Sequence, residues 1–401
     1  MKTSNQASLV PSTKGITRRD GLMLTMLGSA LLMAGCGGGG GGGTTTAGGG
    51  VAGSSATGAI TGFGSIIVGG VRFDDSTASV QDDDGANMNS GDLKLGMVVR
   101  IKGGKKTDDG SSVKAKAESI EVHSELQGPV DSKAADSIVV LGQTVKISAT
   151  TFFEDGLTLA TLALGAVVEV HGFVDPVNNN LTATRIESKP NAKSFKLQGA
   201  IKALNTATKT FTIGTVTISY LTAELPASLV LANDLVVRVR LALTPLTGTR
   251  TALKIRKFEI EKEDRDEAEV EGIITAFTST ALFSVNGLPV NAGNIVVPAG
   301  VKLGARVEVE GNVVNGVLVA KKVELEGGAD VPKFELHGTL SLLDTTAKTF
   351  VLRGMTVKYD SATTFVVGVT ALTLANGNNV EVKGTRSTGN VIVATRISLE
   401  R

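Results

Sequence analysis

The sequence of 401 residues contains one cysteine, no tryptophan, two tyrosines and three histidines. A single cysteine can form neither an internal disulfide nor a cysteine-rich zinc site. The 40 lysines and arginines balance the 39 aspartates and glutamates, and a protein that binds nucleic acid normally carries a basic excess. Hydrophobic residues make up 42% of the chain, which is enough for packed cores and excludes a wholly disordered protein.

The apolar run at residues 21–34 is shorter than the roughly 20 residues that a helix needs to cross a bilayer. Basic residues precede it, and Ala34 and Gly35 stand directly before Cys36. A basic lead, a short apolar core and small residues predict a signal peptide over residues 1–35. The segment resembles a bacterial lipoprotein signal, which implies that the thiol of Cys36 takes a diacylglycerol and becomes the new N-terminus. The alternative, a buried and inert cysteine, conflicts with the glycine run at 37–43.

Arg18 and Arg19 lie just before the apolar run and resemble a twin-arginine export motif. An ordinary basic region read by the general secretory route is the alternative, and both stay open. By analogy with enterobacterial lipoproteins, Gly37 in place of Asp predicts the outer membrane, with the protein facing the periplasm or the cell surface. Residues 36–57 are rich in Gly, Thr and Ser and predict a flexible tether that reaches about 25 Å.

The rest of the chain repeats one pattern of turns and alternating residues. A turn residue is followed by apolar residues at +3 and +5, by mostly charged residues at +4 and +6, and usually by Gly at +7. The turn residues are Gly96, Gly165, Asp234, Gly304 and Gly377. Such period-two alternation indicates a strand with one buried and one solvated face. An Ala-x-x-Ile or Ala-x-x-Val strand follows each time, and each copy opens with a glycine in an apolar strand.

These patterns predict about five short strands per copy and no long amphipathic helix. We therefore expect an all-β protein of five tandem small OB-like β-barrels after the signal peptide and the tether. The third copy is degenerate because it lacks the glycine at the strand end. The acidic stretch at 259–271 and the segment 327–332 are predicted to be the loosest joints. The expected copies span residues 58–125, 126–195, 196–268, 269–334 and 335–401.

The opening glycines, the Phe-x-Val/Ile-x-Gly strands and the Gly-x-x-Val-x-Val-x-Gly strands resemble a bacterial repeat, the domain of unknown function 5666. Residues 62–73, Gly-Phe-Gly-Ser-Ile-Ile-Val-Gly-Gly-Val-Arg-Phe, are the stretch most similar to it. The resemblance covers about residues 58–401. It implies an exported lipoprotein of repeated domains, and the family has no assigned activity.

Candidates for chemistry are few, and no catalytic, cofactor or metal site is predicted. His123, His171 and His337 occupy different places in their copies, so we interpret them as surface polar residues. Residues 82–85, Asp-Asp-Asp-Gly, fail as a calcium loop because Val80 would be its first ligand, and a hairpin turn is expected instead. Tyr220 and Tyr359 are the only candidates for stacking on a sugar, although core packing explains the aromatic residues better.

Glu169, Glu308 and Glu381 share the outward +4 position in three copies. We expect them to pair with lysine or arginine on a neighbouring strand, and carboxylate-pair catalysis is the rival role. The predicted function is a lipid-anchored, non-enzymatic structural or interaction module that contacts the membrane through its lipid and an envelope protein or polysaccharide. The alternative is a binding protein for a small ligand, cation or polysaccharide. The third copy differs most from the repeated pattern, but its changes are towards Leu and Val, which favours the structural or interaction module over the binding protein.

Overall fold

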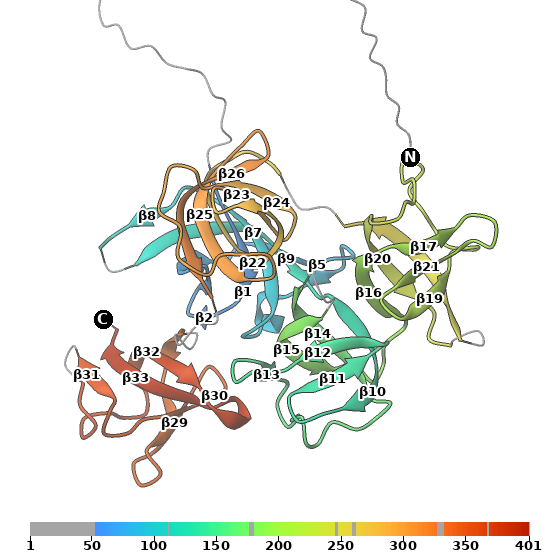
Figure 1. The fold of residues 1–401 in the computed structure, drawn as a ribbon. Helices are drawn as coiled ribbons and strands as arrows, with labels where there is room; N and C mark the ends of the chain where they lie inside the picture. The colour runs from blue at the N-terminus through green and yellow to red at the C-terminus, as the bar shows by residue number, and fades with distance from the viewer. Residues whose placement is uncertain are drawn as a thin grey trace, which may run out of the picture. The chain divides into compact units, whose positions relative to one another are not determined.

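A computed structural model describes residues 53–110, 112–175, 180–244, 248–258, 262–326, 333–366 and 369–400 (Figure 1). Within these residues the regular structure is strands and two single-turn 3₁₀ helices, η1 (Ser90–Asp92) and η2 (Thr388–Asn390). The predicted all-β class is therefore confirmed. No helix among them is long and apolar enough to span a membrane. The predicted signal peptide, Arg18, Arg19 and Cys36 lie outside the described residues.

The strands of residues 126–188 form a small closed barrel. They are β10 (Leu126–Lys133), β11 (Ser137–Val140), β12 (Gln143–Lys146), β14 (Val167–Val174) and β15 (Leu181–Ser188). The antiparallel pairs β10–β11, β11–β12, β14–β15 and β10–β14 and the parallel pair β12–β15 close the ring. A short strand, β13 (Phe152–Phe153), pairs with β15 inside the long connection between β12 and β14. The five-stranded ring with one long crossing connection is the arrangement expected for an OB-like barrel.

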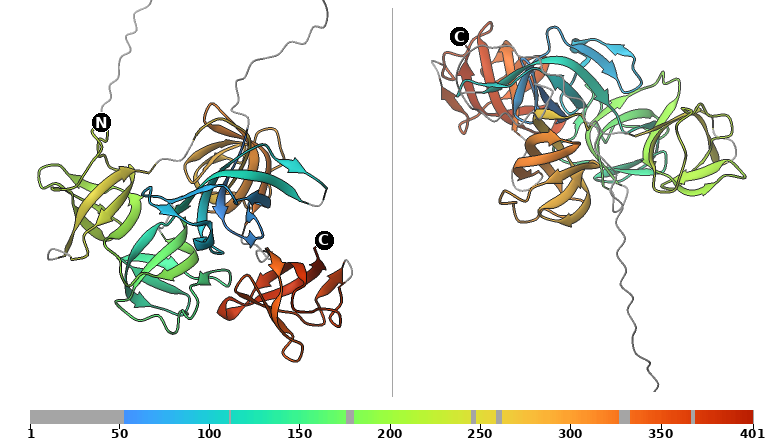
Figure 2. Two further views of the ribbon diagram at one scale, coloured as in Figure 1. Left: turned by 180° about the vertical axis from the view of Figure 1, so that it is seen from behind. Right: turned by 90° about the horizontal axis from the view of Figure 1, so that it is seen from above.

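Four of these five pairings recur in each of four other stretches, and in three of these a separate short strand next to the first strand makes the fifth pairing. We number the stretches 54–123, 126–188, 195–257, 265–325 and 333–399 as segments 1 to 5. Figures 1 and 2 show the strands of segments 2 to 5 as separate curved groups, coloured from green through yellow and orange to red. Segment 1 contains β1 (Ser54–Ala59), β2 (Gly62–Phe63), β3 (Ile66–Val68), β4 (Val71–Asp74), β5 (Ser79–Asp82), β6 (Asn87–Met88), β7 (Val98–Gly103), β8 (Thr107–Asp108) and β9 (Val113–His123). Segment 3 contains β16 (Phe195–Ala200), β17 (Lys202–Asn205), β18 (Thr210–Ile213), β19 (Val216–Ser219), β20 (Val236–Leu241) and β21 (Thr249–Lys257).

Segment 4 contains β22 (Arg265–Ser279), β23 (Leu282–Val285), β24 (Leu288–Asn291), β25 (Arg306–Val314) and β26 (Val317–Leu325). Segment 5 contains β27 (Lys333–Thr339), β28 (Ser341–Asp344), β29 (Thr349–Leu352), β30 (Met355–Lys358), β31 (Thr364–Val366), β32 (Asn379–Arg386) and β33 (Ile392–Leu399). In every segment the third strand of the ring runs parallel to the last strand, as β24 does with β26.

The fold explains why apolar residues and glycines recur at fixed positions of the repeat. The apolar residues at +3 and +5, such as Val168 and Val170, are completely buried, and each contributes about 1.5–3 kcal/mol by leaving water. A Cβ added at Gly172, at position +7, would lie 2.1 Å from the carbonyl oxygen of Thr182 on the paired strand. The turn glycines have φ near +80°, and Asp234 takes a φ of 69° in the third copy, a conformation that Asp tolerates better than most residues.

Strands at the start of the segments also pair with strands of other segments. The segments together form one compact unit over residues 49–401. β1 runs parallel to β22, β2 runs parallel to β27, and β10 is antiparallel to β16. Residues 265–271 of the acidic stretch therefore belong to a strand with partners on both sides, β1 and β25. The prediction of a loose joint was wrong for these residues, because sequence alone did not show that β1 pairs with them. Residues 259–261 and 327–332 lie outside the described residues.

Candidate functional site

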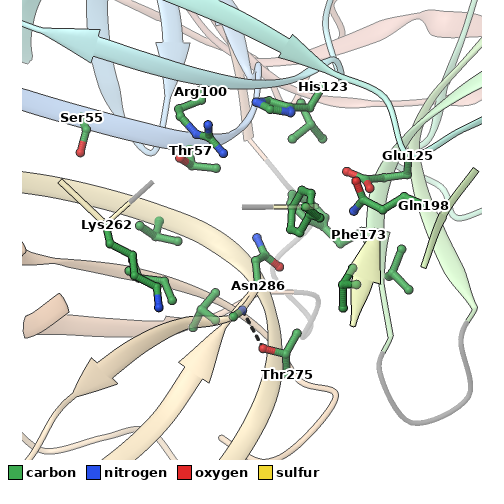
Figure 3. A pocket seen from close by; sticks show the side chains of 18 of the residues that line it. Ser55, Thr57, Arg100, His123, Glu125, Phe173, Gln198, Lys262, Thr275 and Asn286 are labelled. Atoms are coloured by element: carbon green, nitrogen blue, oxygen red, sulfur yellow. Dashed lines mark hydrogen bonds between the residues drawn. The ribbon is translucent and has the colours of Figure 1, made fainter. Parts of the chain in front are cut away.

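A cavity of about 680 Å³ lies where strands of four segments approach one another (Figure 3). Its walls come from β1, β7, β14, β16 and β22 and from the turn between β23 and β24. Apolar side chains form much of the wall, among them Val98, Phe173 and Val270. The volume falls within the roughly 300–1,000 Å³ that is usual for pockets holding small molecules.

Beside the cavity, the buried carboxylate of Asp83 joins segment 1 to segment 3 and to the connection between segments 1 and 2. Its side chain is fully buried, and the Nζ of Lys196 and the Nη1 of Arg238 approach its oxygens to 2.7 and 3.2 Å. The backbone N–H of Ser124 donates a third contact at 3.2 Å. Burial alone would raise the pKa of Asp83, but the attraction of Lys196 and Arg238 outweighs it and lowers the pKa to about 2. Asp83 is therefore ionised at neutral pH.

A chain of hydrogen bonds runs from this carboxylate to the cavity wall. The Nη2 of Arg238 donates to the Oε1 of Gln198 at 3.1 Å and contacts the Nδ1 of His123 at 3.4 Å. Because a guanidinium can only donate, Nδ1 of His123 accepts and the ring proton sits on Nε2. Burial and the nearby charge of Arg100 hold the pKa of His123 well below its usual value, so the ring is neutral.

Glu125 lies where this series of hydrogen bonds reaches the cavity. Its side chain lines the cavity beside Gln198 in Figure 3, and the residue is 8% exposed. Burial raises the pKa of Glu125 to about 7, although Arg238, Lys196 and a hydrogen bond from Gln198 oppose the rise. Its Oε2 is buried and makes no hydrogen bond with the described residues. The site therefore holds a carboxyl group whose proton is exchanged near neutral pH.

The interpretation of the three histidines as surface residues was wrong. His123, His171 and His337 are only 6%, 1% and 2% exposed. The Nδ1 of His171 lies 2.5 Å from the carbonyl oxygen of His123, and His337 lies between Glu335 and Glu400. Each histidine lies on the outward face of its own barrel, where the alternation of residues predicts exposure to solvent. Neighbouring strands and connections cover that face and bury the side chain.

Two groups of carboxylates and histidine have spacings that would suit a metal ion. Glu169, His171 and Glu187 form one group, and the other is formed by Glu335, His337 and Glu381. In the first group the Nζ of Lys189 lies 2.9 Å from Glu169 and 3.0 Å from Glu187. Lys383 lies between two carboxylates of the second group in the same way, at 3.0 and 3.2 Å. An ammonium group of the chain therefore neutralises the carboxylates in both places.

A third group of acidic residues, at 82–84, forms the hairpin turn that the sequence predicted. β5 pairs with β6, and the Oδ1 of Asp82 accepts the backbone N–H groups of Asp84 and Ala86 at 3.0 and 2.8 Å. Sequence reasoning missed the role of Asp83 in the middle of this turn. The only signal for it was a run of three acidic residues, which predicts a solvated turn as readily as a buried ion pair.

The three glutamates at position +4 have different surroundings. Glu169 pairs with Lys189, which directly follows the neighbouring strand β15, so the expectation of a cationic partner from the neighbouring strand is met there. Glu381 has a cation on its own strand instead, because Lys383 at 3.2 Å also belongs to β32. The expectation was wrong for Glu308, which stands opposite Glu271 and Glu324 on its two neighbouring strands. Burial and these like charges raise the pKa of Glu308 to about 8.

The tyrosines serve the barrel cores, in line with the packing interpretation. Tyr359 is 3% exposed and lies within 6.2 Å of Phe350 and 5.9 Å of Phe365, measured between ring centres. The ring of Tyr220 packs against Phe211 with the centres 5.8 Å apart.

The outer faces of segments 3 and 4 carry opposite charges at matching positions on the first, fourth and fifth strands of the ring. We call the face of segment 3 the basic face, and it consists of Lys196, Gln198, Arg238, Arg240, Lys254 and Arg256. The face of segment 4 is the acidic face, and it consists of Glu269, Glu271, Glu308, Glu310, Lys322 and Glu324. Segment 1 meets both. Asp83 and Asp84 pair with the basic face, and Lys106 pairs with Glu269 of the acidic face at 2.7 Å.

The fold and the site define a chain of small closed β-barrels that is held together by buried ion pairs and encloses a cavity. The family model of the domain of unknown function DUF5666 matches residues 127–187, 271–324 and 337–398. These regions are segments 2, 4 and 5, and the resemblance drawn from the sequence is confirmed there. A search of curated proteins found no match to the sequence.

Proposed function

We propose that the chain is a lipid-anchored, non-enzymatic interaction module of the bacterial cell envelope, built from five copies of one barrel. The observation that carries the interaction role is a recurring exposed apolar side chain. It lies in the connection between the third and fourth barrel strands of segments 2 to 5. The side chains are Leu164, Val230, Val296 and Leu372, with exposed fractions of 65%, 81%, 96% and 97%. Apolar side chains exposed in the same connection of successive barrels suit a partner that binds along the array.

Charged groups support the non-enzymatic part of the proposal. Asp83, Lys196, Glu169 and Lys189 are held in ion pairs that fix the barrels, so they contribute to stability. Among the described residues, Glu125, Glu269 and Glu308 are the carboxyls whose pKa lies near neutrality, as general acids require. A turnover screen with polysaccharides, esters, phosphoesters and peptides tests this role directly. We expect no activity, and any turnover that Glu125→Gln or Glu308→Gln abolishes would contradict it.

The anchoring part rests on the sequence around Cys36 and on the glycine-rich tether that follows it. Stable anchoring takes two or more acyl chains, which lipoprotein processing supplies. Radioactive palmitate should label the wild-type protein in a bacterial host and should not label Cys36→Ser. Fractionation of the envelope then distinguishes the outer membrane, which we expect, from the inner membrane. Equal palmitate labelling of the variant would refute the anchor.

Photo-crosslinking in the intact envelope tests the interaction role. A photoreactive residue placed at Val296 or Leu372 should give discrete crosslinked bands. The same residue at Asp155, an exposed polar position, should not. Replacing Val230, Val296 and Leu372 together by Ser should remove the bands obtained from a probe at Leu164. Bands of equal strength from Asp155 would mean that the apolar side chains do not select the partner.

A further inference from the structure

Beyond this interaction role, we propose that the cavity binds an uncharged, largely apolar small molecule that carries one hydroxyl or amide group, which Glu125 and His123 recognise. The site is separate from the exposed apolar side chains of the connections. The two functions can therefore fail independently.

The shape and lining of the cavity set the size and polarity of the ligand. About 680 Å³ accommodates a molecule of one to several rings or an equivalent aliphatic body. Val98, Phe173, Val270, Val285 and Leu288 line it, and all five are buried in the molecule. An apolar body would gain contacts with these side chains, whereas a strongly hydrated molecule would lose its water without replacement.

Glu125 supplies one specific polar contact. Gln198 donates a hydrogen bond to its carboxyl group, and Arg238 in turn holds the Oε1 of Gln198 at 3.1 Å. The Oε2 of Glu125 remains buried without a partner among the described residues. A buried polar atom without a hydrogen bond is unfavourable, and a ligand O–H or N–H placed against it would supply the missing bond.

His123 supplies the second contact. Its Nδ1 already accepts from Arg238, so its Nε2 carries the proton and can only donate. The nearest carboxylate oxygen to Nε2, on Glu121, is 3.6 Å away, which is beyond hydrogen-bond distance, and Nε2 has no other partner in the described chain. A hydroxyl or an amide group can meet either need, because it can donate to the Oε2 of Glu125 and accept from the Nε2 of His123.

The charged groups around Glu125 and His123 disfavour a charged ligand at these two residues. Arg100, Arg238 and Lys196 lie near them, and Asp83 is the one ionised carboxylate that acts on both. This excess of positive charge opposes an organic cation. An anion would have to share the pocket with the Glu125 carboxyl, which loses its proton near pH 7. A neutral molecule meets neither penalty.

Four naphthalene probes separate these possibilities by isothermal calorimetry with the chain from residue 37 onwards, which contains every described residue. Naphthalene tests the apolar cavity alone, and 2-naphthol adds the hydroxyl. 2-Naphthoate and 2-naphthylmethylammonium add a negative and a positive charge. We expect 2-naphthol to bind about 2- to 10-fold more tightly than naphthalene, the range of one net hydrogen bond. Both charged probes should bind more weakly than 2-naphthol.

Variants locate the binding. Glu125→Leu should abolish the preference for 2-naphthol and leave naphthalene binding in place, whereas Glu125→Gln, which keeps an acceptor, should retain the preference. Val236→Trp, which adds bulk to the cavity wall, should weaken both probes at least 5-fold. Glu118→Leu, at an exposed position of β9, is the matched control and should change nothing. Thermal unfolding checks that each variant is folded, and His123→Phe replaces Glu125→Leu if the latter does not fold.

Four results would overturn the proposal. They are no binding of either neutral probe, unchanged binding by Val236→Trp, a preference for 2-naphthol that survives Glu125→Leu, or tighter binding of a charged probe. Failure of the crosslinking experiment with intact probe binding would refute the interaction role alone.

Discussion

Segments 3 and 4 have the same order of strands, yet the two have opposite charges at equivalent positions. On the basic face, Lys196 and Arg238 share the carboxylate of Asp83, whose pKa they lower to about 2. On the acidic face, the positive charge of Lys106 does not offset the effect of burial on the carboxyl groups. The pKa of Glu269 is raised to about 7 and that of Glu308 to about 8. The barrel thus fixes where side chains point, and the charge at those points decides how strongly a segment is joined to its neighbour.

The largest expected effect comes from removing the carboxylate that the basic face requires. Asp83→Leu leaves Lys196 and Arg238 buried without their common partner, which should cost about 3–5 kcal/mol of unfolding free energy. Urea unfolding at pH 7 measures it. The folded pKa of Asp83 is below that of the unfolded chain, so its contribution is present above about pH 4 and is lost as the pH falls towards 2. Asp155→Leu, at an exposed position, should change little.

Lys106 is the corresponding test on the acidic face. Its side chain and that of Glu269 are 8% and 7% exposed, so Lys106→Met leaves a buried carboxyl without its cation. We expect a loss of about 1–3 kcal/mol at pH 8 and a smaller loss at pH 5, where Glu269 can stay protonated. Lys116→Met, at an exposed position of β9, is the control. A loss that is the same at both pH values would show that the charge of Glu269 is not involved.

A stabilising change is expected at Glu308. Its folded pKa of about 8 lies above the ordinary value of 4.5, so the folded protein loses stability as the pH rises from about 4.5 through 8. Glu308→Gln should remove this loss and gain about 1 kcal/mol or more at pH 9, with almost no difference at pH 4. Glu381→Gln is the matched control, because the same strand position pairs with Lys383 and should be neutral or slightly destabilising. Thermal unfolding over this pH range compares the two.

The smallest effect is expected for an exposed ion pair of segment 3. Lys202 and Asp234 contact each other, but their side chains are 60% and 73% exposed. Lys202→Gln should change the unfolding free energy by no more than about 0.5 kcal/mol. An effect near that of Asp83→Leu would mean that burial does not separate strong from weak ion pairs in this protein.

The barrels could be predicted from the sequence because their signals are local. Alternation around Val168 and Val170 indicates an inward face, and Gly172 indicates a close approach between strands. These features depend on neighbours within one segment. The glycine-rich turns recur with each barrel, so the amino-acid sequence alone is enough to reveal the repetition.

The candidate site could not be predicted in the same way. His123, Glu125 and Arg238 are polar residues around strands whose outer faces look solvated, and only contact with other segments buries them. The third segment has Leu241 where the other segments have glycine, and its outer face carries Arg and Lys. The partner of that face, Asp83, lies in a different segment and has no sequence signal that links it to Arg238.

The parallel pairing of β1 with β22 has a consequence for how the chain acquires its structure. Ala59 donates its backbone N–H to the Oε2 of Glu271, a residue 212 positions later, and Gly62 lies beside Glu335 in the last barrel. Contacts at such separations close large loops and slow folding. The first barrel emerges first from the ribosome, yet its strands β1 and β2 find their partners β22 and β27 only after most of the chain has been made. Refolding experiments should therefore show a late phase that a chain ending at residue 258 lacks.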